Sequence, residues 1–195
     1  MKRCFPLLFL ACASLPQVAP AHVHGEARLE IVLEISREGA QKSAQLTITL
    51  DTPLDNLLGF EYAPATDAER EAAASMEKQL SHPEQLFVPD AAAQCAVTLF
   101  ELESPLRTEA PKNEHDHGDK HHHEHGEHHE HHEHGGHDDL EAHYRFTCKN
   151  PDALQGLKVR LFALFPRLQH LQVEFAGPNG QRAAKLDAKN TRFSW

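Results

Sequence analysis

The sequence predicts an α+β fold, in which a single domain combines a largely antiparallel sheet with two helices and a long, disordered, histidine-rich loop. Three observations lead to this prediction. Several short segments alternate apolar and polar residues, which is the pattern of half-buried strands, and two others repeat apolar residues at helical spacing. Between residues 107 and 139 the chain has almost no apolar side chains and is dominated by histidine and acidic residues. We therefore expect this stretch to be a loop inserted into the domain.

Two strands open the predicted domain. Residues 27–35 place Ala, Leu, Ile, Leu and Ile at every second position, and residues 46–50 alternate apolar side chains with threonines. Residues 38–41 supply the turn of a hairpin. After the segment LLGFEYAP, Thr66 and Glu69 have the spacing of a capping box, ahead of an apolar stripe that continues to Leu80. We expect this helix to end near Ser81, before Pro83.

In the second half of the chain the sequence pattern predicts a hairpin, a helix and another hairpin. Strands are expected over 95–103 and 140–148, on either side of the histidine-rich loop, and antiparallel pairing would place Cys95 opposite Cys148. Asn150 and Pro151 have the pattern of a helix start, with the leucines at 154, 157, 161 and 164 forming the apolar face of a helix that stops before Pro166. Residues 171–175 and 183–186 flank the turn GPNG and complete the last hairpin.

The first 21 residues have the organisation of a secretory signal peptide. Two basic residues precede an apolar stretch, and Ala19-Pro20-Ala21 provides a small-residue cleavage site. The apolar run is too short for a transmembrane anchor, which requires roughly 20 residues. Lipidation at Cys12 is a second alternative, although Phe9 and Leu10 do not match a lipobox. We expect cleavage after Ala21, export to the periplasm, and a mature domain over 22–195 without a membrane span.

The net charge and the cysteine content limit the kinds of partner and the kinds of site that the protein can have. The formal net charge of −10 becomes −12 when Lys2 and Arg3 leave with the signal peptide, which argues against a nucleic-acid partner. Cys95 and Cys148 are then the remaining cysteines, and in an exported protein two cysteines are most simply a disulfide. The alternative, a pair of thiolate metal ligands, lacks the close Cys-x-x-Cys spacing of such sites.

The histidine-rich loop predicts metal binding. Twelve of the chain's 17 histidines lie between positions 115 and 137. They are His115, His117, His121, His122, His123, His125, His128, His129, His131, His132, His134 and His137. Imidazole is the commonest metal-ligating side chain and suits Zn(II), Ni(II) and Cu(II). Pairs two apart can chelate from an extended backbone and pairs four apart can chelate from a helix, so the tract is competent in either conformation.

The tract also attracts cations. Six acids and one lysine give residues 115–137 a charge of 1 − 6 = −5. This charge raises the local concentration of divalent ions, and we expect the tract to hold about two to four zinc ions. Disorder in the metal-free state lowers affinity and favours exchange over permanent retention. The HHHEH stretch resembles a zinc-peptidase pattern, but a segment made largely of histidine and glutamate produces such a match by chance.

A second candidate site lies at the new N-terminus. Cleavage after Ala21 would expose an α-amine followed by His22 and His24, a set that can chelate Cu(II) or Ni(II) and can give zinc two or three ligands. The competing interpretation is a frayed polar terminus. His143, near the start of the strand that leaves the tract, is a further candidate ligand, although a plain surface histidine fits equally well. His82 and His170 lie at the ends of predicted elements, where we expect them to be exposed or to cap a helix and not to bind a metal.

Several segments together resemble one family. The start HVHGEARLEIVLE, the loop LLGFEYAP, Cys95, the histidine-rich insert, YRFTC, LFALFP and NGQRAAKL are similar to the ZrgA-like, zinc-regulated periplasmic proteins of Gram-negative bacteria. The resemblance implies a periplasmic zinc-binding protein that assists high-affinity zinc import, and it matches His22, His24 and the tract to the family's histidine-rich positions. Relatives often carry a histidine where this chain has Tyr62, so a ligand from that loop is in doubt.

The leading hypothesis is a non-enzymatic protein that captures Zn(II) on the tract and buffers it, or passes it to the periplasmic solute-binding protein of a zinc ABC importer. Sequestration of nickel or copper for metal tolerance is a second hypothesis, since imidazole-rich sites bind Cu(II) more tightly than zinc. The third is a metallohydrolase with a catalytic zinc at His22 and His24. A general base for such an enzyme is not evident in the sequence.

Overall fold

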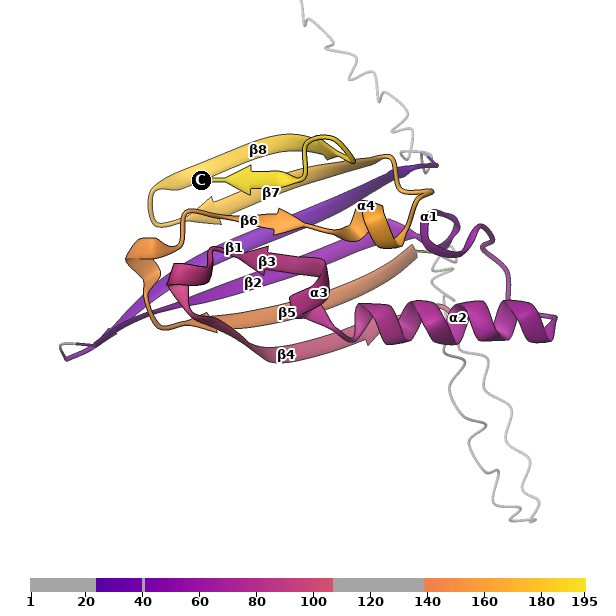
Figure 1. Cartoon of the computed structure of the whole chain (residues 1–195), viewed down its shortest axis with the longest axis horizontal. Helices are drawn as coiled ribbons and strands as arrows, with labels where there is room; N and C mark the ends of the chain where they lie inside the picture. The colour runs from indigo at the N-terminus through magenta and orange to yellow at the C-terminus, as the bar shows by residue number, and fades with distance from the viewer. Residues whose placement is uncertain (1–23, 40, 107–138) are drawn as a thin grey trace, which may run out of the picture.

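A computed structural model of the chain describes residues 24–39, 41–106 and 139–195 (Figure 1). The predicted signal peptide (1–21), His22 and the twelve histidines of the tract lie outside these residues. In chain order the described elements are β1 (Glu26–Glu38), β2 (Gln41–Pro53), α1 (Leu54–Leu58), α2 (Asp67–Leu80), α3 (Pro83–Leu86), β3 (Phe87–Pro89), η1 (Ala91–Ala93), β4 (Cys95–Glu103), β5 (Asp139–Cys148), η2 (Pro151–Ala153), β6 (Gly156–Val159), α4 (Leu161–Leu164), β7 (His170–Gly177), β8 (Gly180–Asp187) and β9 (Arg192–Ser194).

The strands form two sheets. The larger sheet has six strands in the order β4-β5-β2-β1-β7-β8, and the smaller sheet has the order β3-β6-β9. All described pairings are antiparallel except that of β1 with β7. The prediction of a largely antiparallel single domain is therefore confirmed, but strands dominate and α2 is the one described helix longer than five residues.

Alternating residues give the six-stranded sheet one covered face. Leu46, Ile48 and Leu50 of β2 are fully buried, while the threonines between them are half-buried on the opposite face. The neighbouring strands follow the same alternation, because paired residues share a face. The small sheet lies across this apolar face, as Figure 1 shows for β3 and β6 in front of β1 and β2. One core joins the two layers.

The helix predicted from Pro151 to just before Pro166 is wrong. These residues form η2, β6 and α4 instead. In β6 Leu157 and Val159 are buried and Lys158 between them is exposed, so the period is two and not 3.6. A Cβ at Gly156 would collide with the backbone oxygen of Phe193, which shows how closely β6 and β9 approach. Asn150 caps no long helix, because its side-chain amide donates to the carbonyl of Ala92 at 3.1 Å.

Helix α2 begins and ends as predicted. The Thr66 hydroxyl accepts from the Glu69 amide at 3.2 Å, and the Glu69 carboxylate accepts from the Thr66 amide at 2.8 Å. The Glu69 carboxylate accepts from the Thr66 amide, from the Tyr62 hydroxyl at 2.7 Å and from the Ala65 amide at 2.9 Å, and these bonds lower the pKa of Glu69 to about 2. Tyr62 is thus tied to the capping box of α2.

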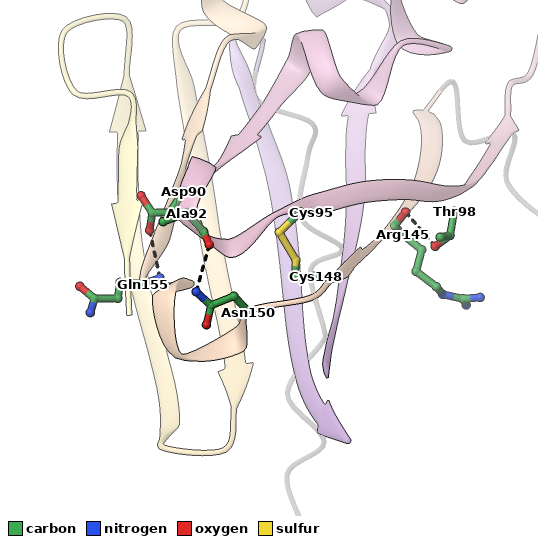
Figure 2. The surroundings of a disulfide bond; sticks show 8 residues. All are labelled: Asp90, Ala92, Cys95, Thr98, Arg145, Cys148, Asn150 and Gln155. Atoms are coloured by element: carbon green, nitrogen blue, oxygen red, sulfur yellow. Dashed lines mark hydrogen bonds between the residues drawn. A yellow bond between two sulfur atoms is a disulfide. The ribbon is translucent and has the colours of Figure 1, made fainter. Parts of the chain in front are cut away.

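Strands β4 and β5 form the predicted hairpin, and its two cysteines are bonded. Cys95 pairs directly with Cys148, and the two form a disulfide (Figure 2). The interpretation of these cysteines as a thiolate metal site is therefore wrong in this state of the protein. A register shift between Val97 and Leu99 interrupts the pairing, and there the Thr98 hydroxyl donates to the carbonyl of Arg145 at 3.3 Å. The disulfide stands at one end of the hairpin and residues 104–138 join the strands at the other.

Candidate metal centre

Four strand ends meet at one end of the six-stranded sheet. The start of β1 pairs with the end of β2, through Arg28 and Asp51. The end of β2 pairs with the start of β5, and the start of β5 pairs with the end of β4, through Glu141 and Glu103. Figure 1 shows these ends on the same side of the sheet as α1. The N-terminal segment and both strands that flank the tract therefore leave the fold from the same end of the sheet.

A buried amide anchors the N-terminal segment at this end. Asn56 of α1 is fully buried, and its side-chain oxygen accepts from the Gly25 amide at 2.6 Å. Its side-chain nitrogen donates to the carbonyl of Glu26 at 2.7 Å and to the Thr52 hydroxyl at 3.2 Å. Buried polar groups are costly unless satisfied, so these bonds fix the backbone beside His24. No pattern in the sequence marks this anchor, because a single asparagine has no periodicity.

His24 lies against a carboxylate that is itself held in place. The Nδ1 atom of His24 is 3.2 Å from Oδ2 of Asp55, and the His24 side chain is 69% exposed while that of Asp55 is 19% exposed. Arg167 contacts Asp55 twice, from its terminal nitrogen to Oδ1 at 3.2 Å and from Nε to the backbone oxygen at 3.1 Å. A carboxylate that orients an exposed imidazole is the usual arrangement around metal-ligating histidines.

His143 is placed differently. It lies on the open face of the sheet, between Thr49 of β2 and Glu101 of β4. Its Nε2 is 3.2 Å from a Glu141 oxygen and its Nδ1 is 3.2 Å from the Thr49 hydroxyl. Both ring nitrogens therefore already have partners, and a metal ion would have to displace one of them.

An acidic row crosses the open face at the base of the tract. Glu103, Glu141 and Asp51 are in register on three neighbouring strands. Beyond Asp51, a shallow hollow of about 100 Å³ includes Arg28 and Glu30 among its lining residues. Like charges directly opposite each other destabilise a sheet, so the facing pair of Glu103 and Glu141 has a cost, whereas Asp51 has Arg28 opposite it on β1.

Within the described ranges the structure brings no three histidine, cysteine or acidic side chains into a ready-made metal site. His82 and His170 have other surroundings. Nδ1 of His82 is 3.9 Å from Oε1 of Glu84. Nδ1 of His170 is buried and has no hydrogen-bond partner among the described residues. Of the predicted ligands, the described ranges include His24 and His143. None of the described helices is long and apolar enough to span a membrane.

Comparison with known families gives a match over residues 21–195 to the family described as "ZrgA family zinc uptake protein". The chain belongs to this family. The ZrgA match covers every element described above, and it confirms the resemblance inferred from the sequence. Membership implies a role in zinc uptake, and the family description names no catalytic activity. No curated protein matches the chain.

Proposed function

We propose that this protein is exported to the periplasm, captures Zn(II) on the histidine tract over 115–137, and buffers it or delivers it to the solute-binding protein of a high-affinity zinc importer. Cleavage after Ala21 would release the signal peptide and leave His22 and His24 at the N-terminus. The fold acts as a rigid support, and zinc is cargo that the protein binds and releases.

The observation that carries this proposal is the shared sheet end. β1 and β5 are separated by one strand, so the start of the domain and the base of the tract lie about 10 Å apart at typical strand spacing. Two histidine-rich segments that are about 90 residues apart in the sequence (24 against 115, 115 − 24 = 91) are thus tethered to the same end of one sheet. This proximity supports a composite capture region rather than two independent sites.

Charge at the base of the tract supports capture as well. The row of Glu103, Glu141 and Asp51 adds to the negative charge of the tract, and a concentration of one sign of charge raises the local concentration and on-rate of divalent cations. Salt screens this attraction, so capture should slow as ionic strength rises.

Release follows from the chemistry of imidazole. Neutral imidazoles bind zinc, and protons compete for the same lone pairs near the ordinary histidine pKa of about 6.5. We expect bound zinc to be retained at neutral pH and lost progressively below about pH 6. Native mass spectrometry of zinc-loaded protein across this range measures the loss, and retention of the full complement well into acid would contradict ligation by histidine.

The decisive experiment compares the processed chain with a variant in which the twelve tract histidines are glutamine. Calorimetric titration and native mass spectrometry with Zn(II), Ni(II) and Cu(II) should show about two to four zinc ions on the unaltered protein and a loss of most of them in the variant. A His82→Gln variant serves as the matched control for loss of a surface histidine outside the tract. Absence of zinc binding at neutral pH would remove the proposal.

Cell growth and location complete the test. A strain carrying the tract variant should grow as poorly on zinc-chelated medium as a strain without the protein, and the unaltered protein should restore growth. A tract variant that restores growth fully would show that the tract does not serve zinc uptake. N-terminal sequencing of protein from a periplasmic extract should begin at His22, and recovery of uncleaved protein in the cytoplasm would contradict export.

A further inference from the structure

We propose that Asp55 is a positioning residue that holds His24 with its Nε2 atom facing outward as a ligand for Zn(II). This inference rests on the proposed function and assigns a role to residues on α1 and after α4 that no pattern in the sequence marked.

The hydrogen bond between the two side chains determines which ring nitrogen is free. A carboxylate can only accept, so the contact of 3.2 Å requires the proton of a neutral imidazole to be on Nδ1 of His24. The lone pair is then on Nε2. No described residue forms a hydrogen bond with Nε2, and the side chain is 69% exposed, so this lone pair is open to an ion from solvent.

Asp55 is suited to positioning rather than to direct ligation. Oδ1 is already bonded to Arg167, whose positive charge would repel a cation bound at the same carboxylate. Oδ2 remains for His24. A carboxylate behind an imidazole fixes its tautomer and orientation and raises the basicity of the outward nitrogen.

The backbone on both sides of this contact is fixed. Leu54 and Asn56, which flank Asp55 in α1, are buried. Asn56 also binds the backbone at Gly25 and Glu26, immediately after His24. The backbone next to His24 and the helix that carries Asp55 are therefore joined through the same buried amide, which places the two side chains close together before an ion binds.

His143 is an internal contrast. Its Nδ1 forms a hydrogen bond with the Thr49 hydroxyl, and its Nε2 is 3.2 Å from a Glu141 oxygen, so both ring nitrogens contact groups of the protein. The same residue type at the same end of the sheet is prepared for an ion at position 24 and engaged within the protein at position 143.

The first measurement needs no substitution. Long-range nitrogen–proton correlation NMR of the metal-free, full-length processed protein reports which ring nitrogen of each histidine carries the proton. We expect the Nδ1-protonated tautomer at His24. An Nε2-protonated His24 would overturn the proposal, and Asp55→Asn should shift His24 away from the Nδ1-protonated form.

The second measurement is zinc affinity in the chain whose twelve tract histidines are glutamine, by competition with a chromophoric chelator. Loss of a carboxylate behind a ligating histidine costs about 10- to 100-fold in metal affinity, so Asp55→Asn should weaken zinc binding at least about 10-fold in this background. His24→Gln should abolish it, and because this side chain is exposed the variant should fold. Asp90→Asn is the matched control, since it removes a 24% exposed carboxylate that is paired with an arginine and has no histidine partner.

The outcomes separate the two proposals. Unchanged affinity in both Asp55→Asn and His24→Gln would refute the role of Asp55 and leave tract capture standing. Failure of the unsubstituted full chain to bind zinc would refute the proposed function, while the NMR tautomer would still report on the contact between Asp55 and His24. An equal loss of affinity in Asp90→Asn would indicate a general charge effect and overturn the positioning role.

Discussion

On one face of the six-stranded sheet the side chains of Leu46, Ile48 and Leu50 are fully buried under the second sheet, whereas on the other face the threonines between them are only half-buried. The covered face holds the core and the disulfide, because Cys148 is fully buried on this side of β5. The open face carries the acidic row and His143. An antiparallel sheet can face water on one side, so the core packs on one face of these strands while the acidic side chains and His143 lie on the other.

Removal of the disulfide on the covered face should cause the largest loss of stability. The bond joins residues 53 positions apart, and in the loop-entropy account a bridge of this length contributes about 4 kcal/mol. A Cys95→Ala/Cys148→Ala variant should lose about that much free energy of unfolding in denaturant titrations. Reduction of the unaltered protein should have a similar effect, and a loss below about 1 kcal/mol would show that the hairpin is held by its packing alone.

Truncation of a side chain on the covered face should cause the second-largest loss of stability. Leu46→Ala removes a fully buried side chain and should cost about 3 kcal/mol, since it leaves a cavity in the core. Thr47→Ala, one residue along the same strand, is the matched control on the open face and should change stability by about 0.5 kcal/mol or less. Equal losses at the two positions would mean that the open face is packed against something in the folded protein.

The same contrast explains which parts of the fold the sequence predicts. Long strands such as β1 and β2 alternate over many residues, so their apolar period and their hairpin turn are visible in the sequence. The capping box at Thr66 and Glu69 is a local pattern of this kind, and the pairing of Cys95 with Cys148 follows from their places on the two strands that flank the tract. Each of these predictions is confirmed.

The covering sheet has no such pattern. β3, β6 and β9 are three or four residues long, and at that length one or two apolar residues fit a strand and a helix equally well. The leucines around β6 therefore predicted a helix. The contact of Asp55 with His24 was missed for another reason, because it depends on where β2 ends and α1 begins in space. The predicted tract ligands and His22 lie outside the described residues and stay predictions.

Acid should weaken an ion pair at the edge of the open face. Hydrogen bonding from Lys185 at 2.7 Å, followed by bonding from Gln172, lowers the pKa of Glu26 below its ordinary value of 4.5. A lowered carboxyl pKa contributes stability that is present above pH 4.5 and is lost as the pH falls through the folded-state pKa. Glu26→Gln should therefore lower the melting temperature slightly at pH 7 and leave it unchanged in strong acid. A melting difference that grows as the pH falls would show that the charged form is not the stabilising one.

Removal of the charge of Glu103 should have the smallest effect on stability and a clear effect on the rate of zinc capture. Glu103 lies directly opposite Glu141 on β5, and removal of one of two facing like charges should stabilise the sheet by about 0.5 kcal/mol. Glu103→Gln should nevertheless slow zinc association in stopped-flow measurements at low ionic strength, because it reduces the negative potential at the base of the tract. The difference from the unaltered protein should shrink as salt is added. Glu174→Gln, on β7 of the same face and farther along the sheet from the tract, controls for loss of one open-face charge. If Glu103→Gln makes the protein less stable and leaves the rate of zinc capture unchanged, Glu103 contributes to stability and not to capture.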